Sequence, residues 1–284
     1  MADLKCVSLN VRGLRGEKRN TIFRWLTDNQ FDICLLQETY CTKEFADRFK
    51  KGWEGEIIHS LSNSSHSRGV CILLKKGLLC KTTSVHCDDS GRLLLVNLEI
   101  GGNEYSICNI YCPNVVNERI LFLQRMENFI ETNAISKRNL LIGGDFNCVD
   151  SMTDKSTGSL DKSSKFLNDL KNKMCLIDMW RFKNPETIEY TYIDPSSNCR
   201  NSRIDLWLST KALMSNIQNC NITQAPAPDH KAVCFYMVMD KKIRGKGYWK
   251  MNNQVITEKD YVEGITTLYN EVVLDYGHHV TKGN

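Results

Sequence analysis

The hydrophobic and polar positions along this 284-residue chain switch repeatedly between the two-residue period of a β-strand and the longer period of an α-helix. Short apolar runs that end in polar or glycine residues predict strands at 4–11, 31–37, 69–74, 93–100, 104–111, 139–142, 176–180, 189–193, 203–208 and 231–238. One-sided apolar faces predict helices at 18–29, 117–130 and 163–174. Alternating strands and helices, with a hairpin at 101–103, predict an α/β four-layered sandwich, two packed mixed β-sheets flanked by helices.

The pattern changes near residue 240, so we expect a domain at 1–239 and an extension at 240–284. Residues 241–247 are basic, contain glycine and have no periodicity, which is typical of a linker. Residues 257–260 can cap a helix whose apolar face carries Tyr261, Ile265, Leu268 and Val272. A lone amphipathic helix needs a partner surface. Either it folds back on the domain, or the chain is part of a longer protein.

Composition narrows the class of protein. Hydrophobic residues make up 42% and charged residues 25%, as in ordinary globular proteins. No apolar run approaches the ~20 residues that cross a bilayer, and residues 1–6 lack a secretion signal, so we expect an intracellular protein with no membrane partner. The 13 cysteines are odd in number, lack a Cys-x-x-Cys pair and lie mostly in apolar runs, which favours reduced core residues. The net charge of +4 permits a polyanionic partner without requiring one.

The segment Gly143-Gly144-Asp145-Phe146-Asn147 follows an apolar run and is interpreted as a strand that ends in a glycine turn. The glycines would let the backbone bend and leave room for a ligand. Asp145 and Asn147 would then project from one strand end, where ligands of open α/β sheets usually bind. The segment alone is equally compatible with a plain loop containing an Asx turn.

Polar groups at the ends of the other predicted strands change that balance. They are Asn10, Glu38, Tyr111, Asp205, Asp229 and His230. Each has an ordinary structural explanation when taken singly, for example a satisfied strand carboxylate or a core ring with a hydrated hydroxyl. Their joint placement predicts a cleft at one edge of the sandwich.

This set of groups suits hydrolysis of a phosphate ester. Glu38, Asn10 and Asp229 offer the oxygen ligands that a hard cation prefers. Asp145 is the candidate for the base that deprotonates a water molecule. No Gly-x-Ser-x-Gly elbow or Walker loop is present in the sequence.

Hydrogen-bond donors for the phosphate charge complete the predicted site. The Asn147 amide, the Tyr111 hydroxyl and His230 can supply them. Asp205 within hydrogen-bond reach of His230 would fix its tautomer and favour the imidazolium form.

Six ordered motifs carry a resemblance to a known family. They are Ser8 to Leu14, Leu35 to Thr39, Asn109 to Asn114, Gly143 to Asn147, Ser202 to Asp205 and Asp229-His230. Over residues 3–238 the chain resembles the endonuclease/exonuclease/phosphatase superfamily, and most closely the apurinic-type endonuclease domain that opens LINE-type (non-LTR) retrotransposon reverse transcriptase polyproteins. Residues 245–252 are similar to the segment that follows this domain in those polyproteins. No reverse transcriptase motif is present, so the resemblance implies a fragment.

The resemblance implies a Mg²⁺-dependent enzyme, with Mn²⁺ as a substitute, that nicks double-stranded DNA. The new 3′-hydroxyl would prime target-primed reverse transcription. The implied partners are double-stranded DNA and the rest of the polyprotein with its RNA. The domain would be a monomer that acts in the nucleus after synthesis in the cytoplasm.

The family's roles carry over to matching positions. The resemblance places Glu38 and Asn10 at the metal with Asp229 adjoining it, makes Asp145 the base, assigns phosphate binding to Asn147 and Tyr111, and makes His230 the transition-state stabiliser with Asp205 behind it. Candidate DNA-binding residues are Arg12, Asn114, Thr191, Ser202 and Arg203, with Arg15, Lys18, Arg19 and Arg119 as further basic residues near the cleft.

Two positions depart from the family pattern. Arg12 stands where repair enzymes have an aspartate, which argues against an abasic-site repair role and leaves one carboxylate fewer near the metal. Pro228 stands where many retrotransposon enzymes have serine. The alternatives that stay open are a repair-type apurinic/apyrimidinic endonuclease, a phosphatase acting on inositol or lipid phosphates, and a DNA-binding module without activity.

Overall fold

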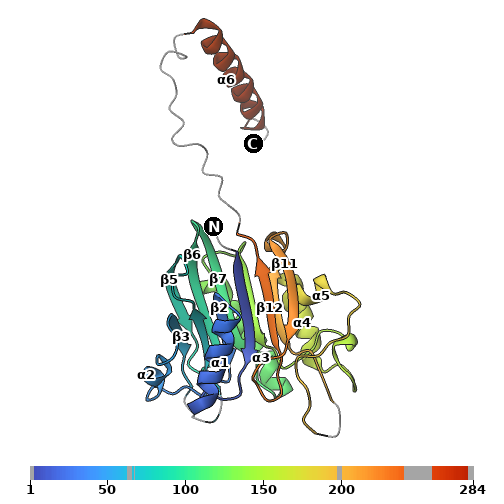
Figure 1. Ribbon diagram of the computed structural model, residues 1–284. Coiled ribbons are helices and arrows are strands. Elements are labelled where there is room, and N and C mark those ends of the chain that lie inside the picture. The colour runs from blue at the N-terminus through green and yellow to red at the C-terminus, as the bar shows by residue number, and fades with distance from the viewer. Residues whose placement is uncertain (1–2, 63–65, 67, 197–199, 240–257, 281–284) are drawn as a thin grey trace. The chain divides into compact units, whose positions relative to one another are not determined.

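A computed structural model of the chain describes residues 3–62, 66, 68–196, 200–239 and 258–280. The chain separates into two compact units, residues 1–241 and 242–284. Within the described residues, the first unit contains two six-stranded mixed β-sheets (Figure 1). The predicted linker at 241–247 and the predicted helix cap at Thr257 lie outside the described residues.

The first sheet has the strand order β11 (Ile217–Thr223), β12 (Ala232–Met237), β1 (Leu4–Asn10), β2 (Ile33–Gln37), β4 (Val70–Leu74) and β3 (Glu56–Ser60). The second has the order β5 (Cys80–Cys87), β6 (Leu93–Ile100), β7 (Asn103–Tyr111), β8 (Leu140–Asp145), β10 (Asp205–Thr210) and β9 (Leu176–Asp178). Each sheet has one parallel pair, β1 with β2 and β7 with β8. The strands of a parallel pair end at the same edge, and this brings their exit residues together.

The helices are α1 (Gly16–Asp28), α2 (Ala46–Phe49), α3 (Val116–Asn133), α4 (Lys162–Lys173), α5 (Met179–Lys183) and, in the second unit, α6 (Lys259–Val280). Short 3₁₀ turns lie at Met152–Asp154 and Lys211–Leu213. No helix among the described residues is long and apolar enough to span a membrane. In α6, Ile265 and Leu268 of the predicted apolar face are exposed.

The alternation along β1 explains the layering of the first sheet. Cys6 belongs to the apolar cluster between the two sheets, whereas Val7 and Leu9 belong to a cluster on the outer face. Ile22 and Leu26 of α1 pack in that outer cluster. Helix α1 therefore covers the first sheet with the face that the sequence predicts.

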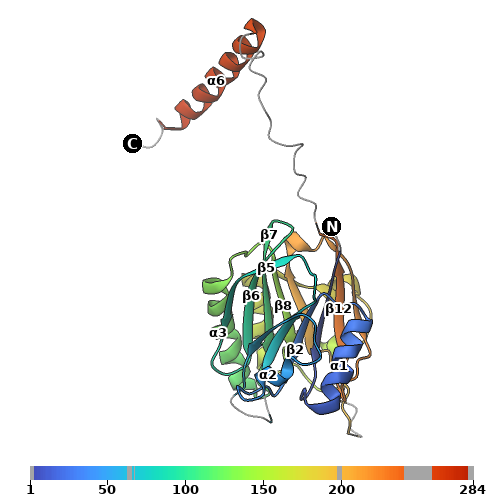
Figure 2. The ribbon, with the colours of Figure 1, turned by 60° about the vertical axis from the view of Figure 1, so that its left-hand side comes forward.

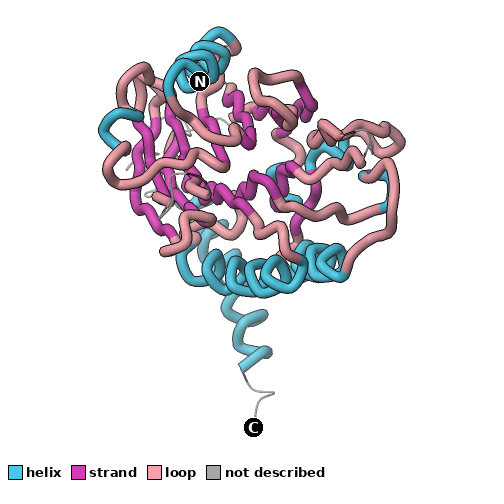
Figure 3. The backbone as a smooth tube through the Cα atoms, turned by 90° about the horizontal axis from the view of Figure 1, so that it is seen from below, coloured by secondary structure: helices cyan, strands magenta, loops and turns pink. Residues whose placement is uncertain are grey.

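The outer face of the second sheet carries α3 and α4. Phe122 and Met126 of α3 and Leu167 of α4 share one buried cluster with Ile110 and Ile142 of the sheet. Figure 2 shows α1 and α3 on opposite sides of the strands, and Figure 3 shows strands in the middle of the domain with helices outside. The predicted four-layered sandwich is confirmed.

Some predicted elements differ from the structure. The strand predicted at 189–193 is absent, and Tyr192 makes only isolated bridges to Ser202 and His230. The extended run at 176–180 divides into β9 and the start of α5, because the Asp178 carboxylate accepts from Arg181 N and caps the helix. Strands β3, β5 and β11 have no counterpart among the predicted elements. Residues of β5 alternate between half-buried and exposed positions at a sheet edge, so its hydrophobic signal is weak.

Candidate active site

Strand ends from both sheets meet at one edge of the sandwich. Asn10 ends β1, Tyr111 ends β7 and Asp145 ends β8. Tyr111 and Asp205 both pair with Asp145 in the register of the second sheet. The predicted gathering of polar groups at one edge therefore follows from strand pairing.

The two glycines before Asp145 have a different role from the predicted one. Both lie inside β8, which continues to Asp145. A Cβ on Gly143 would lie 2.8 Å from the Trp207 ring, and one on Gly144, at φ +148°, would lie 2.0 Å from the Ile110 carbonyl oxygen. The space beside them is filled by protein and is not left for a ligand. The turn begins after Asp145.

Asn10 connects the two sheets at the site. Its fully buried side-chain nitrogen donates to Glu38 Oε1 at 2.9 Å and to Asp145 Oδ2 at 3.0 Å. Its Oδ1 accepts from the backbone nitrogen of Arg12 at 3.0 Å. One amide thus fixes a carboxylate from each sheet and the loop that follows β1.

Glu38 is held in the charged form by neutral donors. Its Oε2 accepts from the Tyr40 hydroxyl at 2.6 Å, in addition to the Asn10 bond. Burial alone would raise the pKa of Glu38, but hydrogen bonds from Asn10, Tyr40 and Tyr111 outweigh burial and lower the pKa. The backbone of Glu38 has φ +51°, a left-handed conformation uncommon outside glycine.

In contrast to Glu38, Asp145 has a raised pKa. It is 1% exposed, and its Oδ1 accepts from Asn147 N at 2.8 Å. Burial and the nearby Asp205 carboxylate raise the pKa of Asp145 to about 7. A carboxylate that takes up a proton near neutral pH is suited to act as a general base. The side-chain nitrogen of Asn147 donates to the Cys112 carbonyl at 2.8 Å, so one of its hydrogens is already used.

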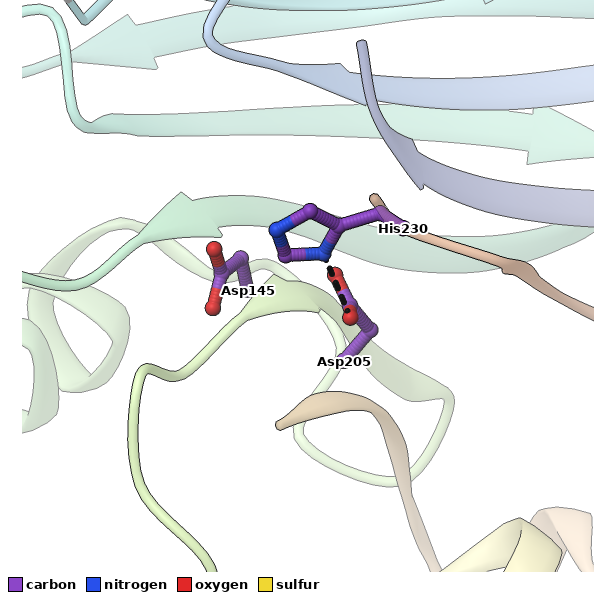
Figure 4. Close-up of side chains that lie close together, drawn as sticks. All are labelled: Asp145, Asp205 and His230. Carbon is purple, nitrogen blue, oxygen red and sulfur yellow. Dashed lines mark hydrogen bonds and ion pairs between the residues drawn. The ribbon is translucent and has the colours of Figure 1, made fainter. Parts of the chain in front are cut away.

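His230 and Asp205 form a buried pair beside Asp145. His230 Nδ1 lies 2.9 Å from Asp205 Oδ2, and Figure 4 shows Asp145 on the other side of the imidazole. Burial opposes the charge on His230, but the Asp205 carboxylate outweighs burial and raises the pKa of His230 to about 9. The Tyr192 ring packs 5.3 Å from the imidazole. The structure therefore brings together the two residues that the sequence pairs.

Tyr111 is a donor near Glu38 and Asp145. Burial, followed by the charges of these two carboxylates, raises the pKa of Tyr111, so its hydroxyl keeps its proton. Arg92 is a participant that the sequence does not predict. Its guanidinium stacks 4.7 Å from the Tyr111 ring and donates to the Tyr111 carbonyl at 3.1 Å, which fixes the ring.

The donor set fits a hard divalent cation. Glu38 offers carboxylate oxygens just after β2, the Asn10 oxygen already accepts from Arg12 N, and Asp205 Oδ1 is buried without a hydrogen-bond partner among the described residues. Asp145, Asp205 and His230 also offer ligand atoms within 4.8 Å of one another. Carboxylate and amide oxygens are the ligands that Mg²⁺ prefers.

Arg12 and Asp229 form an ion pair at the rim of the site. The Arg12 guanidinium donates to Asp229 Oδ2, and the arginine side chain is 48% exposed, whereas that of Asp229 is 2% exposed. Arg12 can therefore still reach a ligand from solvent. Asn114, also predicted to bind DNA, is exposed after Tyr111, and Ser202 is half-buried.

Two predicted DNA-binding residues have structural roles instead. Arg203 is 1% exposed and forms ion pairs with Asp154 and Asp178, each at 2.7 Å, so it cannot reach a DNA backbone. Thr191 is fully buried, and its hydroxyl oxygen accepts from Asp205 N at 3.0 Å. It positions Asp205 rather than DNA.

Arg119, expected as a basic residue near the cleft, also has a structural role. It is 3% exposed and is used inside the protein, where it forms an ion pair with Asp161 at 2.8 Å and donates to the Pro113 and Asn114 carbonyls.

Tyr40 is a partner of Glu38 that the sequence analysis does not predict. Its position two residues after Glu38 was the available signal.

The four-layered sandwich with buried carboxylate, amide and imidazole groups at one edge defines a protein equipped for phosphoester chemistry. A profile described as the Endonuclease/Exonuclease/phosphatase family matches residues 7–217, and the chain belongs to this family of nucleases and phosphatases. The family resemblance stated from the motifs is confirmed.

Among similar proteins, an uncharacterised 149 kDa protein of transposon TX1 from Xenopus laevis is 29% identical over 265 residues. That match covers 92% of this chain, and the chain spans about a fifth (20%) of the length of that relative. An AP endonuclease from Archaeoglobus fulgidus superposes with a TM-score of 0.70 at 19% identity, covering 83% of this chain and 100% of that one. The endonuclease domain of TRAS1, a telomere-specific non-LTR retrotransposon, superposes with a TM-score of 0.63 at 14% identity, covering 83% and 98%.

Proposed function

We propose that this chain is a Mg²⁺-dependent endonuclease that nicks double-stranded DNA. The observation that carries the proposal is the position of Asp145. Its carboxylate is fixed by Asn10 and Asn147 and lies beside the His230–Asp205 pair. A base and a cationic donor are thereby held close together at one edge of the sandwich.

The chain's own groups divide the chemistry between them. Asp145 accepts a proton from the attacking water, and the two amides that hold its carboxylate keep it oriented. His230 donates to the phosphate as an imidazolium, which Asp205 stabilises. The Tyr111 hydroxyl, which hydrogen-bonds to Glu38 in the absence of substrate, turns its single proton to the phosphate. A divalent ion held by the Glu38 carboxylate would, when bound, offset the charge that develops on the phosphate oxygens.

Exposed groups around the site support DNA as the substrate. Arg12 and Arg15 project from the loop that follows β1, and Asn114 is exposed after β7. Basic residues at such positions contact backbone phosphates and give salt-dependent binding.

The proposed cellular role is supported by the relatives. Similarity to a transposon protein and to a retrotransposon endonuclease domain supports a nick whose 3′-hydroxyl primes target-primed reverse transcription. The proposal includes the rest of a polyprotein with its RNA as partners, and a monomeric domain. It also includes synthesis in the cytoplasm and action in the nucleus.

A supercoiled-plasmid assay with Mg²⁺ tests the activity. Asp145→Ala and His230→Ala should each lower the nicking rate by about 10²–10⁴-fold. Asp47→Ala is the matched control, because Asp47 is an exposed carboxylate on α2 with 92% side-chain exposure. A polymerase should extend the nicked product, which reports the 3′-hydroxyl. Equal relaxation by all four proteins contradicts the proposal.

A comparison of three substrates distinguishes the nicking activity from a repair-type endonuclease and a phosphatase. The same proteins are offered an intact duplex, a duplex with one abasic site, and inositol polyphosphate. We expect cleavage of the intact duplex. Cleavage restricted to the abasic duplex would assign a repair-type activity, and release of phosphate from the inositol compound would assign a phosphatase.

A further inference from the structure

The ion pair between Arg12 and Asp229 joins two loops that are 217 residues apart in the chain. Arg12 adopts φ +47°, and its backbone nitrogen donates to Asn10 Oδ1 at 3.0 Å. The Arg12 carbonyl accepts from Lys18 Nζ, also at 3.0 Å. The base of the arginine side chain is thus fixed on both sides by neighbouring residues.

Asp229 receives its counter-charge from Arg12. Its side chain is 2% exposed, and a buried carboxylate needs a cation close to it. Oδ2 accepts from the guanidinium, while Oδ1 has no hydrogen-bond partner among the described residues. Arginine side chains are positively charged in proteins. A metal ion placed on Asp229 would lie next to this fixed charge and be repelled by it.

Glu38, unlike Asp229, has no arginine or lysine paired with its carboxylate among the described residues. Its oxygens accept from the neutral Asn10 amide and Tyr40 hydroxyl, and it forms no ion pair with any described residue. Of the two carboxylates assigned to the metal from the sequence, Glu38 is therefore the one without a paired cation in the described part of the chain.

We propose that the Arg12 guanidinium occupies the position beside Asp229 that a metal ion would otherwise take. The site then binds a single divalent ion at Glu38, and Asp229 is not one of its ligands. The inference rests on the proposed function, which requires that ion. It assigns Arg12 to the electrostatics of the metal site, a role separate from contact with DNA.

Titration with Mn²⁺ alone, followed by electron paramagnetic resonance of the free ion, tests this without DNA. Wild-type protein should bind one Mn²⁺, and Glu38→Gln should weaken its binding about tenfold or more. Asp229→Asn should change the affinity by less than about twofold, because its charge is already neutralised. Arg12→Gln should free Asp229 and add a second bound Mn²⁺, which the double variant with Asp229→Asn should lose. Arg15→Gln, an exposed neighbour stacked on Phe45, is the control and should resemble wild type.

Three results would overturn the inference: two ions bound to the wild type, a loss of affinity in Asp229→Asn as large as in Glu38→Gln, or unchanged binding in Arg12→Gln. Circular dichroism of each variant establishes that it is folded before the titration is read. A protein that follows the expected binding pattern but does not nick DNA contradicts the proposed function and leaves the role of Arg12 intact.

Discussion

Replacing Asp205 by asparagine removes one charge behind His230 and keeps the shape of the side chain. The pKa of His230 is raised from 6.5 to about 9, which corresponds to about 3 kcal/mol in favour of the imidazolium at about 1.4 kcal/mol per tenfold change. With Asp205 neutral, the main cause that raises the pKa of His230 is removed, and the pKa should fall toward its ordinary value of 6.5. For a pKa of 6.5 in the variant, the imidazolium population at pH 8 should drop about thirtyfold, whereas at pH 6 it should change less than about twofold.

Single-turnover nicking of a duplex at pH 6 and pH 8 measures this directly. The ratio of wild-type to Asp205→Asn rates should rise steeply between the two values, and proton resonances of His230 in metal-free protein should report the lowered pKa. Stability gives a second readout. A raised pKa of His230 stabilises the fold below pH 6.5, and this contribution is lost as pH rises through about 9, so the variant should lack that decline in urea unfolding. A rate ratio that is the same at both pH values refutes the reasoning.

Three further outcomes follow from the packing. Arg203→Met removes the buried cation that Asp154 and Asp178 share and should lower the free energy of unfolding by about 3–5 kcal/mol in urea titration. Gly144→Ala places a Cβ against the Ile110 carbonyl at 2.0 Å and should cost about 1–3 kcal/mol or more, measured in the same way. Truncation after Lys241 should leave plasmid nicking unchanged, and lost nicking would assign residues 242–284 to the catalytic domain.

The sandwich is predictable from the sequence because most of its strands are apolar runs that end abruptly in polar residues. Asn10, Glu38 and Asp145 stand at such ends, and parallel pairing within each sheet brings strand ends to one edge. The sequence does not predict edge strand β5, because every second residue faces solvent and the run contains few large apolar side chains. Hydrophobic periodicity therefore identifies a strand that is rich in buried apolar residues and misses one, such as β5, in which every second residue is exposed.

The structural role of a charged residue is harder to predict from the sequence than its position near the site. Arg203 and Arg12 both occur in motifs near the site, and sequence alone treats them alike. Arg203 is enclosed because Asp154 and Asp178 converge on it from segments 49 and 25 residues away. Arg12 meets Asp229 across 217 residues. Burial and partners of this kind come from tertiary packing, which local patterns do not encode.

The position of Asp145 relative to Asn10 depends on how the two sheets are aligned, since the two residues belong to different sheets. Apolar contacts between sheets tolerate small displacements, whereas hydrogen bonds do not. Between the sheets, Gln37 Nε2 donates to Asn109 Oδ1 at 2.7 Å, and Asn109 Nδ2 donates to the carbonyls of Leu36 at 3.1 Å and Cys71 at 2.8 Å. All of these bonds are buried, so a displaced sheet would leave polar groups unsatisfied at about 1–3 kcal/mol each. This network, one residue before Glu38 and two before Tyr111, therefore selects the alignment in which the site is assembled.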